Sequence, residues 1–242
     1  MDLFFVTLGL VLSVLFGGLT VAYFKANNKS QATKLTLAFS GGFLLAIIFQ
    51  HLIPDIYHDD SHSIGIFILI GFLIQLILEF FSGGIEHGHV HLHEKQKIPW
   101  LLFISLSLHS IIEGIPLGNG MVGIESTDTH EHGSLLWGII FHQFPVAIAL
   151  MTLLLGAFKH SLHAWLVLIT FSLMTPIGCF LGFLISPEQI GLDVHMVLAV
   201  VIGMFLHIST TIIFETSENH KFNFLKLLSI VVGVAFAMAL YH

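Results

Sequence analysis

IPWLLFISLSLHSIIEGIPLGN, residues 98–119, is an almost uninterrupted apolar run that contains His109 and Glu113 in its interior. A run of about 20 apolar residues is long enough to cross the hydrocarbon core of a bilayer as an α-helix. A bare carboxylate in the middle of such a helix would take up a proton or bind a cation. The stretch therefore predicts a membrane-spanning helix that carries a functional acidic group.

The composition of the whole chain points to the same environment. Of the 242 residues, 55% are apolar and only 10% are charged, and the mean hydropathy is +0.93. A soluble domain carries roughly 25% charged residues, so lipid is the simplest explanation for the missing charge. The net charge of −7 leaves no basic surface for nucleic acid, and the single cysteine, Cys179, excludes a disulfide framework or a cysteine-based zinc site.

Eight stretches are long and apolar enough to cross a bilayer, and they predict an all-α polytopic membrane protein with one transmembrane domain over residues 1–242. The first stretch follows Asp2 instead of a basic segment, and no small-residue cleavage site follows it. We therefore interpret it as a permanent span and not as a signal peptide. The predicted spans are residues 3–24, 33–53, 62–83, 98–119, 134–157, 161–185, 192–214 and 222–241.

The loop charges predict the orientation of these spans. The chain has no arginine, and its lysines all lie in or beside the odd-numbered loops, whereas the even-numbered loops carry acidic residues. Because positive charge is retained on the cytoplasmic side, we expect both termini outside the cytoplasm and the protein in the plasma (inner) membrane. The lysines are Lys25, Lys29, Lys34, Lys95, Lys97, Lys159, Lys221 and Lys226.

His109 and Glu113 are the strongest candidates for a metal site. They lie four residues apart, so they share one face of the predicted helix. Together they offer an imidazole nitrogen and a carboxylate oxygen, which zinc, iron and manganese accept as ligands. The alternative is an ion pair between neighbouring helices that binds no metal.

Two prolines add backbone groups to this region. Pro116 and Pro145 each leave a carbonyl one turn earlier without its helical N–H donor. Broken helices near the membrane centre are where transporters place ion sites. Each freed carbonyl lies next to a polar side chain, which is Glu113 in the first case and His142 in the second.

Other ionisable residues in the spans have competing interpretations. His51 near the outer end of the second span is a candidate ligand, and Asp55 beside it is an accessory candidate that could also reach water. His207 is an accessory candidate that could equally form a hydrogen bond to a neighbouring helix. Glu79 and Glu215 lie near inner helix ends, where we expect them to be solvated.

The third loop, at about residues 84–97, is rich in histidine and is expected on the cytoplasmic side. Short histidine-rich tracts bind metal loosely, although this one could also be a polar linker. Its accessory candidates occupy alternate positions, namely His87, His89, His91 and His93.

At these residues the chain resembles the ZIP (Zrt-, Irt-like protein) family of divalent-metal transporters. HSIIEG at residues 109–114 matches the family's HSxxEG pattern, and HLIPD at 51–55 is similar to its HLxPE. TPIG at 175–178 and GMFLHISTTIIFE at 203–215 are also similar.

The resemblance implies a 3+2+3 bundle in which helices 1–3 and 6–8 form inverted repeats around helices 4 and 5. It implies a transport site between helices 4 and 5, with helix 2 contributing, and inward movement of zinc or a similar ion as substrate without a required cofactor. A homodimer would rest on analogy with the family alone. The implied metal-facing residues are His109, Glu113, His142, His51 and Gln143.

One departure from the family bears on the metal. The fifth helix of the family usually reads HxxxE, but Val146 occupies the glutamate position here, and Ser110 replaces an asparagine that some members carry. A single site is therefore expected in place of a two-metal centre. With fewer anionic ligands, this site should favour metals that prefer imidazole, such as zinc over manganese.

Two alternatives to transport stay open on the sequence. An intramembrane metal-dependent hydrolase needs three protein ligands and an open position for water, but the chain has no HExxH motif and no obvious nucleophile elbow. A metal sensor or transport-deficient relative is favoured by Val146. The prediction is a transporter and not an enzyme.

Overall fold

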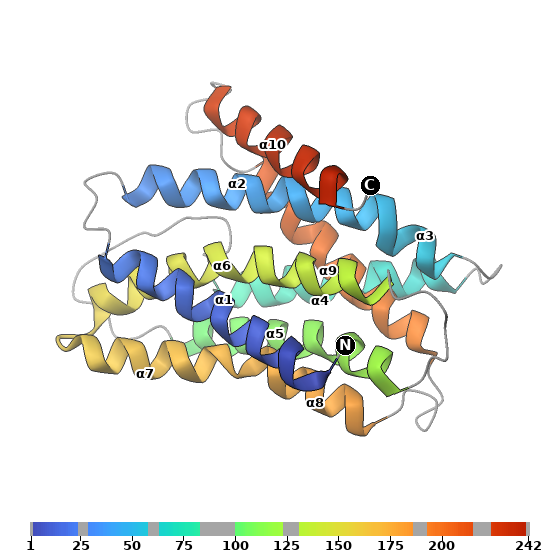
Figure 1. Ribbon diagram of the computed structural model, residues 1–242, viewed down its shortest axis with the longest axis horizontal. Helices are drawn as coiled ribbons and strands as arrows, with labels where there is room; N and C mark the ends of the chain where they lie inside the picture. Colours follow the sequence, from blue (N-terminus) through green and yellow to red (C-terminus); the bar gives the residue numbers. More distant parts are fainter. Residues whose placement is uncertain are drawn as a thin grey trace.

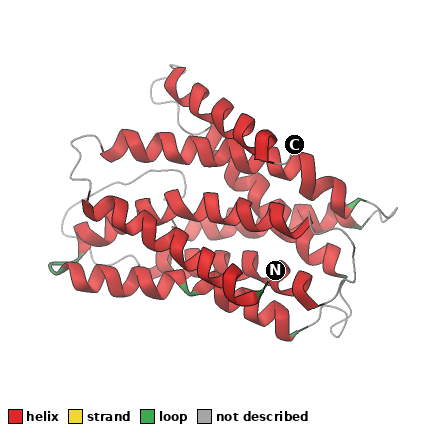
Figure 2. Ribbon diagram, in the orientation of Figure 1, coloured by secondary structure: helices red, strands yellow, loops and turns green. Residues whose placement is uncertain are grey.

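The computed structural model describes residues 2–23, 29–57, 63–82, 100–122, 131–185, 193–214 and 224–240, and the statements below concern these residues. Within them the chain is helical apart from short turns, and no strand occurs (Figure 2). The predicted all-α fold is confirmed.

The helices form eight passes along the long axis of the bundle, with both chain ends toward the same side (Figure 1). Seven passes are long and apolar enough to cross a membrane, and the last is an apolar helix of 17 residues. The helices are α1 (Leu3–Tyr23), α2 (Lys29–Ile47), η1 (Ile48–Leu52), α3 (Ile53–Ile56), α4 (Ile64–Ser82), α5 (Trp100–Val122), α6 (Glu131–Ala157), α7 (Ser161–Ser172), α8 (Met174–Leu184), α9 (Val194–Phe214) and α10 (Phe224–Leu240).

Two passes are interrupted within three residues before a proline. In the second pass, η1 is a π-helical turn in which the N–H of Ile53 donates to the carbonyl of Ile48, and Pro54 follows it. In the sixth pass, Leu173 separates α7 from α8, and Pro176 cannot donate to the carbonyl of Ser172. Pro116 and Pro145, in contrast, lie inside the continuous helices α5 and α6.

The most extensive packing divides the passes into two groups. In the first group, α1 packs on α6 and α5 packs on α8, with α7 against α1 and α6. In the second, α2 packs on α10 and α4 packs on α9, with α9 also against α2. The groups meet where α2 contacts α6 and where α4 contacts α5. The inverted repeats of the 3+2+3 arrangement stay a prediction.

Glycine allows α5 and α8 to approach backbone to backbone. A Cβ atom on Gly118 would lie 1.9 Å from the carbonyl oxygen of Cys179, and one on Gly178 would lie 2.0 Å from that of Ile111. Small residues at such spacing are the usual means by which membrane helices pack closely. The same contact includes Gly114 and Gly182.

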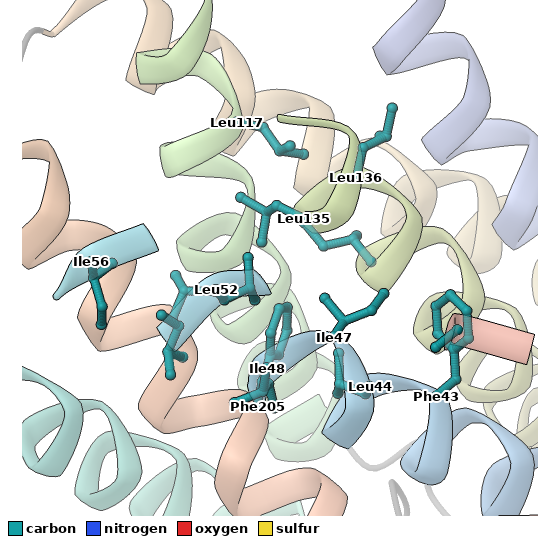
Figure 3. Close-up of a cluster of buried hydrophobic side chains, with 14 of the residues drawn as sticks. Phe43, Leu44, Ile47, Ile48, Leu52, Ile56, Leu117, Leu135, Leu136 and Phe205 are labelled. Atoms are coloured by element: carbon teal, nitrogen blue, oxygen red, sulfur yellow. The ribbon is translucent and has the colours of Figure 1, made fainter. Parts of the chain in front are cut away.

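An apolar cluster fills the region where the second pass meets α5, α6 and α9 (Figure 3). Its members on the second pass extend from Phe43 to Ile56, and Leu117, Leu135 and Phe205 come from the other three helices. Leu52, Leu117 and Leu135 lie toward the ends of their helices on the side of the bundle that carries the termini. The described helices are therefore closely packed on this side of the bundle.

Both ends of α9 are held by side chains. At its start, the backbone N–H of His195 donates to Asp193 at 2.9 Å, and this bond holds the pKa of that carboxyl below its usual range. At its end, Lys226 of α10 donates to the carbonyls of Ile212 and Ile213 at 2.8 and 2.9 Å. A lysine at a helix C-terminus satisfies carbonyls that have no intrahelical donor.

The contact between α5 and α8 predicts that Gly178→Ala will destabilise the protein. The new methyl group meets backbone that cannot rotate away, so the helices must separate, and overpacking of this kind costs about 1–3 kcal/mol. Thermal unfolding of the purified protein in detergent measures the effect. Gly133→Ala is the matched control, because nothing lies within 4 Å of its added Cβ. Equal melting temperatures for the two variants would contradict the packing described.

Candidate metal site

His109 and Glu113 lie one helical turn apart on α5, and their side chains are in contact. The Nε2 atom of His109 is 3.3 Å from Oε2 of Glu113, and both residues are almost fully buried. The pair lies near the middle of α5, far from either end of the helix. The structure thus brings the two strongest sequence candidates together.

The second oxygen of Glu113 is held by neighbouring helices. Gln143 on α6 donates its amide N–H to Oε1 at 2.6 Å, and the hydroxyl of Thr175 on α8 donates to the same oxygen at 3.2 Å. The Gln143 amide also forms a hydrogen bond to the Thr175 hydroxyl oxygen. The carboxylate is therefore stabilised by neutral donors, and Oε2 is the oxygen directed at His109.

His109 has a partner on its other side as well. Its Nδ1 atom lies 2.9 Å from Oε1 of Gln75 on α4, and Gln75 is fully buried. The ring of His142 on α6 approaches His109 edge to face, with ring centroids 5.9 Å apart. Two imidazoles, one carboxylate and two amides therefore gather where α4, α5, α6 and α8 meet.

The space between these groups is a narrow cavity with no room for a water-sized sphere. The polar part of its wall comes from α5 and α6, and Leu106, Val146 and Phe171 form the apolar part. Val146 is buried in the position where the resemblance would place a glutamate. The polar lining residues are His109, Ser110, Glu113, His142 and Gln143.

The other candidates on the second pass lie on its interrupted segment. His51 lies on the π-helical turn η1 and Asp55 on α3, at the side of the bundle that carries the termini. In the part of the chain that the structure describes, no three His, Cys, Asp or Glu side chains are placed to hold one ion together. The loop candidates His87, His89, His91 and His93 lie outside the described residues.

His207 has a carboxylate partner that the sequence analysis assigned to solvent. Its Nδ1 atom is 3.2 Å from Oε2 of Glu79 on α4, and its ring packs edge to face against Phe72. The Glu79 side chain is only 17% exposed. The expectation that Glu79 is solvated was wrong, because the face of α4 that carries it packs on α9.

Two polar residues around the site, Gln75 and Thr175, were not predicted from the sequence. Gln75 is the only amide in the apolar run of α4, and a polar side chain in such a run is expected to find a partner on another helix. That signal could have identified Gln75. Thr175 begins the TPIG stretch, but threonine is common in membrane helices and can bond to its own backbone, so the stretch does not indicate a partner for its hydroxyl.

The family can now be assigned from the chain itself. The model of the family described as ZIP Zinc transporter matches residues 83–241, which include α5, α6 and the residues around Glu113. The chain belongs to the ZIP zinc transporter family.

Individual relatives are similar over different lengths. Zinc transporter ZIP1 of Danio rerio is 24% identical over an alignment of 291 positions. The alignment covers 96% of this chain and 94% of that protein. Protein zntD of Dictyostelium discoideum is 29% identical over 171 residues, which cover 64% of this chain and only 24% of that protein. This ZIP chain therefore matches nearly the whole length of the first relative and about a quarter of the second.

The hydrogen bonds of Glu113 predict a role for the Thr175 hydroxyl in stability. Thr175→Val keeps the shape of the side chain but leaves both the carboxylate and the Gln143 amide one partner short. Loss of a hydrogen bond to a charged group costs about 1.5–3 kcal/mol, so the melting temperature in detergent should fall. Thr175→Ser retains the hydroxyl and should melt close to the unmodified protein. A Val variant as stable as the Ser variant would show that this bond contributes nothing.

Proposed function

We propose that this chain carries zinc, or a divalent ion of similar chemistry, across the bilayer toward the cytoplasm through a site built on His109 and Glu113. Membership of the ZIP zinc transporter family supports divalent-metal transport as its function. Transporters are not enzymes, so the relatives favour transport over the hydrolase alternative.

The observation that carries the site assignment is the separation between the two side chains. Two zinc ligands at about 2.0–2.1 Å from the metal, with a tetrahedral angle between them, lie about 3.3–3.4 Å apart. Nε2 of His109 and Oε2 of Glu113 are 3.3 Å apart. An ion could therefore bind both atoms with little change in their spacing.

Neighbouring groups complete the proposed site. His142 faces His109 across the α5–α6 contact and would supply a second imidazole. Gln143 lies beside Glu113 and would exchange its bond to the carboxylate for a contact with the ion. His51 lies on η1, which packs on α6, and is proposed as a further imidazole ligand from the second pass. Asp55, His207 and the loop histidines stay accessory candidates.

The direction of transport rests on the distribution of charge. The lysine-bearing loops are proposed to be cytoplasmic, which places both termini and the acidic loops outside. The apolar cluster in Figure 3 packs the described helices together on the side of the bundle that carries the termini. We propose that alternating access arises when the two helix groups move relative to each other at the α2–α6 and α4–α5 contacts.

Substitution of the two central residues tests the proposed function. Glu113→Gln and His109→Ala should each reduce uptake of labelled zinc into proteoliposomes to nearly the level of protein-free liposomes, because each variant loses one ligand. Glu79→Gln and His195→Ala are matched controls that change the same residue types outside the cluster. Flux like that of the unmodified protein in both central variants would overturn the assignment.

The preferred metal follows from the number of carboxylates around the cavity. With Glu113 as its single carboxylate, the site should transport zinc in preference to manganese in a competition assay. Val146→Glu adds a second carboxylate to the wall and should increase manganese uptake and the metal content per chain. Val146→Gln controls for size. Manganese outcompeting zinc in the unmodified protein would contradict the proposed selectivity.

A metal sensor or transport-deficient relative is the second candidate, and the observation that favours it is the position of Val146. This side chain lines the cavity where the family pattern has a carboxylate. A sensor would bind zinc with an affinity that depends on His109 and Glu113 but would give no flux in proteoliposomes. The uptake assay above therefore separates the two functions.

A further inference from the structure

We infer that Gln75 is a positioning residue that fixes the tautomer and orientation of His109, so that Nε2 faces the transported ion. The inference rests on the proposed function, because it assigns a role to Gln75 only if His109 is a ligand. Gln75 acts through His109 and has no proposed contact with the ion.

The chemistry of the contact determines which nitrogen carries the proton. The atom of Gln75 that faces His109 is Oε1, and an amide oxygen can only accept a hydrogen bond. Nδ1 of His109 must therefore be the donor across the 2.9 Å separation. In the neutral ring this leaves the lone pair on Nε2, which is the atom directed toward Glu113.

The opposite tautomer would prevent binding. If Nε2 carried the proton of the neutral ring, it could donate a hydrogen bond to Glu113 but could not coordinate a metal. Both Gln75 and His109 are buried, so water does not readily take over the role of the amide. Partners of this kind, which accept a bond from the second nitrogen of a ligating histidine, contribute substantially to metal affinity.

The contact also crosses between the two helix groups. Gln75 lies on α4, which packs mainly on α9, whereas His109 lies on α5, which packs mainly on α8. The bond therefore exists only in the arrangement in which these faces of α4 and α5 are opposite each other. If Gln75 only stabilised the α4–α5 interface, its replacement would not change the affinity of His109 for an ion.

Zinc binding to the purified full-length protein in detergent, measured by isothermal titration calorimetry, tests the inference. Gln75→Leu removes the acceptor and should weaken zinc binding about 10- to 100-fold. Gln75→Glu keeps an oxygen acceptor and should restore binding to near that of the unmodified protein. Ile64→Ala removes packing from the same helix, about three turns away, and should lower the melting temperature with little change in affinity.

A double-mutant cycle separates positioning from a purely structural role. In a His109→Ala background, Gln75→Leu should cause no further loss of affinity, because its effect passes through the missing imidazole. If Gln75→Leu does not fold, Gln75→Met of similar length takes its place in the cycle. Unchanged zinc affinity in the apolar variant, or an additive loss in the double variant, would overturn the inference.

The same measurements distinguish failure of the inference from failure of the proposed function. Zinc binding that requires His109 but is insensitive to Gln75 would reject the positioning role and leave the proposed function intact. Absence of zinc binding by the unmodified protein would reject both.

Discussion

A carboxylate buried in the middle of a membrane-spanning helix is the constraint on which the rest of the site depends. An ionised Glu113 without partners would be strongly unfavourable in a low-dielectric interior. Hydrogen bonds from the Gln143 amide on α6 and the Thr175 hydroxyl on α8 stabilise its Oε1 atom, while Oε2 faces the His109 ring on the same helix. These contacts join α5, α6 and α8 at the Glu113 side chain.

The character of these partners is as important as their number. Gln143 and Thr175 are neutral donors, so they stabilise the negative charge without cancelling it. A lysine or arginine at either position would form an ion pair and compete with a metal ion. Neutral solvation of Glu113 leaves an electrostatic attraction for a cation at the centre of the bundle, and the apolar wall formed by Leu106, Val146 and Phe171 strengthens it.

Much of this arrangement could be predicted from sequence because it depends on local spacing. The passes follow from runs of apolar residues, and the contact between His109 and Glu113 follows from helix periodicity. Gln75 and Thr175 lie 34 and 62 residues from their partners, so only the tertiary packing of α4 and α8 on α5 reveals their roles. Glu79 was expected in solvent because it lies near the end of its helix. Its side chain instead pairs with His207, because α9 covers that face of α4.

The glycine contact between α5 and α8 has a consequence for the transport cycle. Because the two backbones are in contact, α5 and α8 would move together in the proposed alternating-access motion, and Thr175 would stay beside Glu113. Gln75 lies on α4 in the other helix group, so it would not move with them. If the two helix groups slide past each other, Glu113 keeps its hydrogen bond from Thr175, whereas His109 loses its hydrogen bond to Gln75. The affinity for the ion would then differ between the two conformations, without any residue titrating or unfolding.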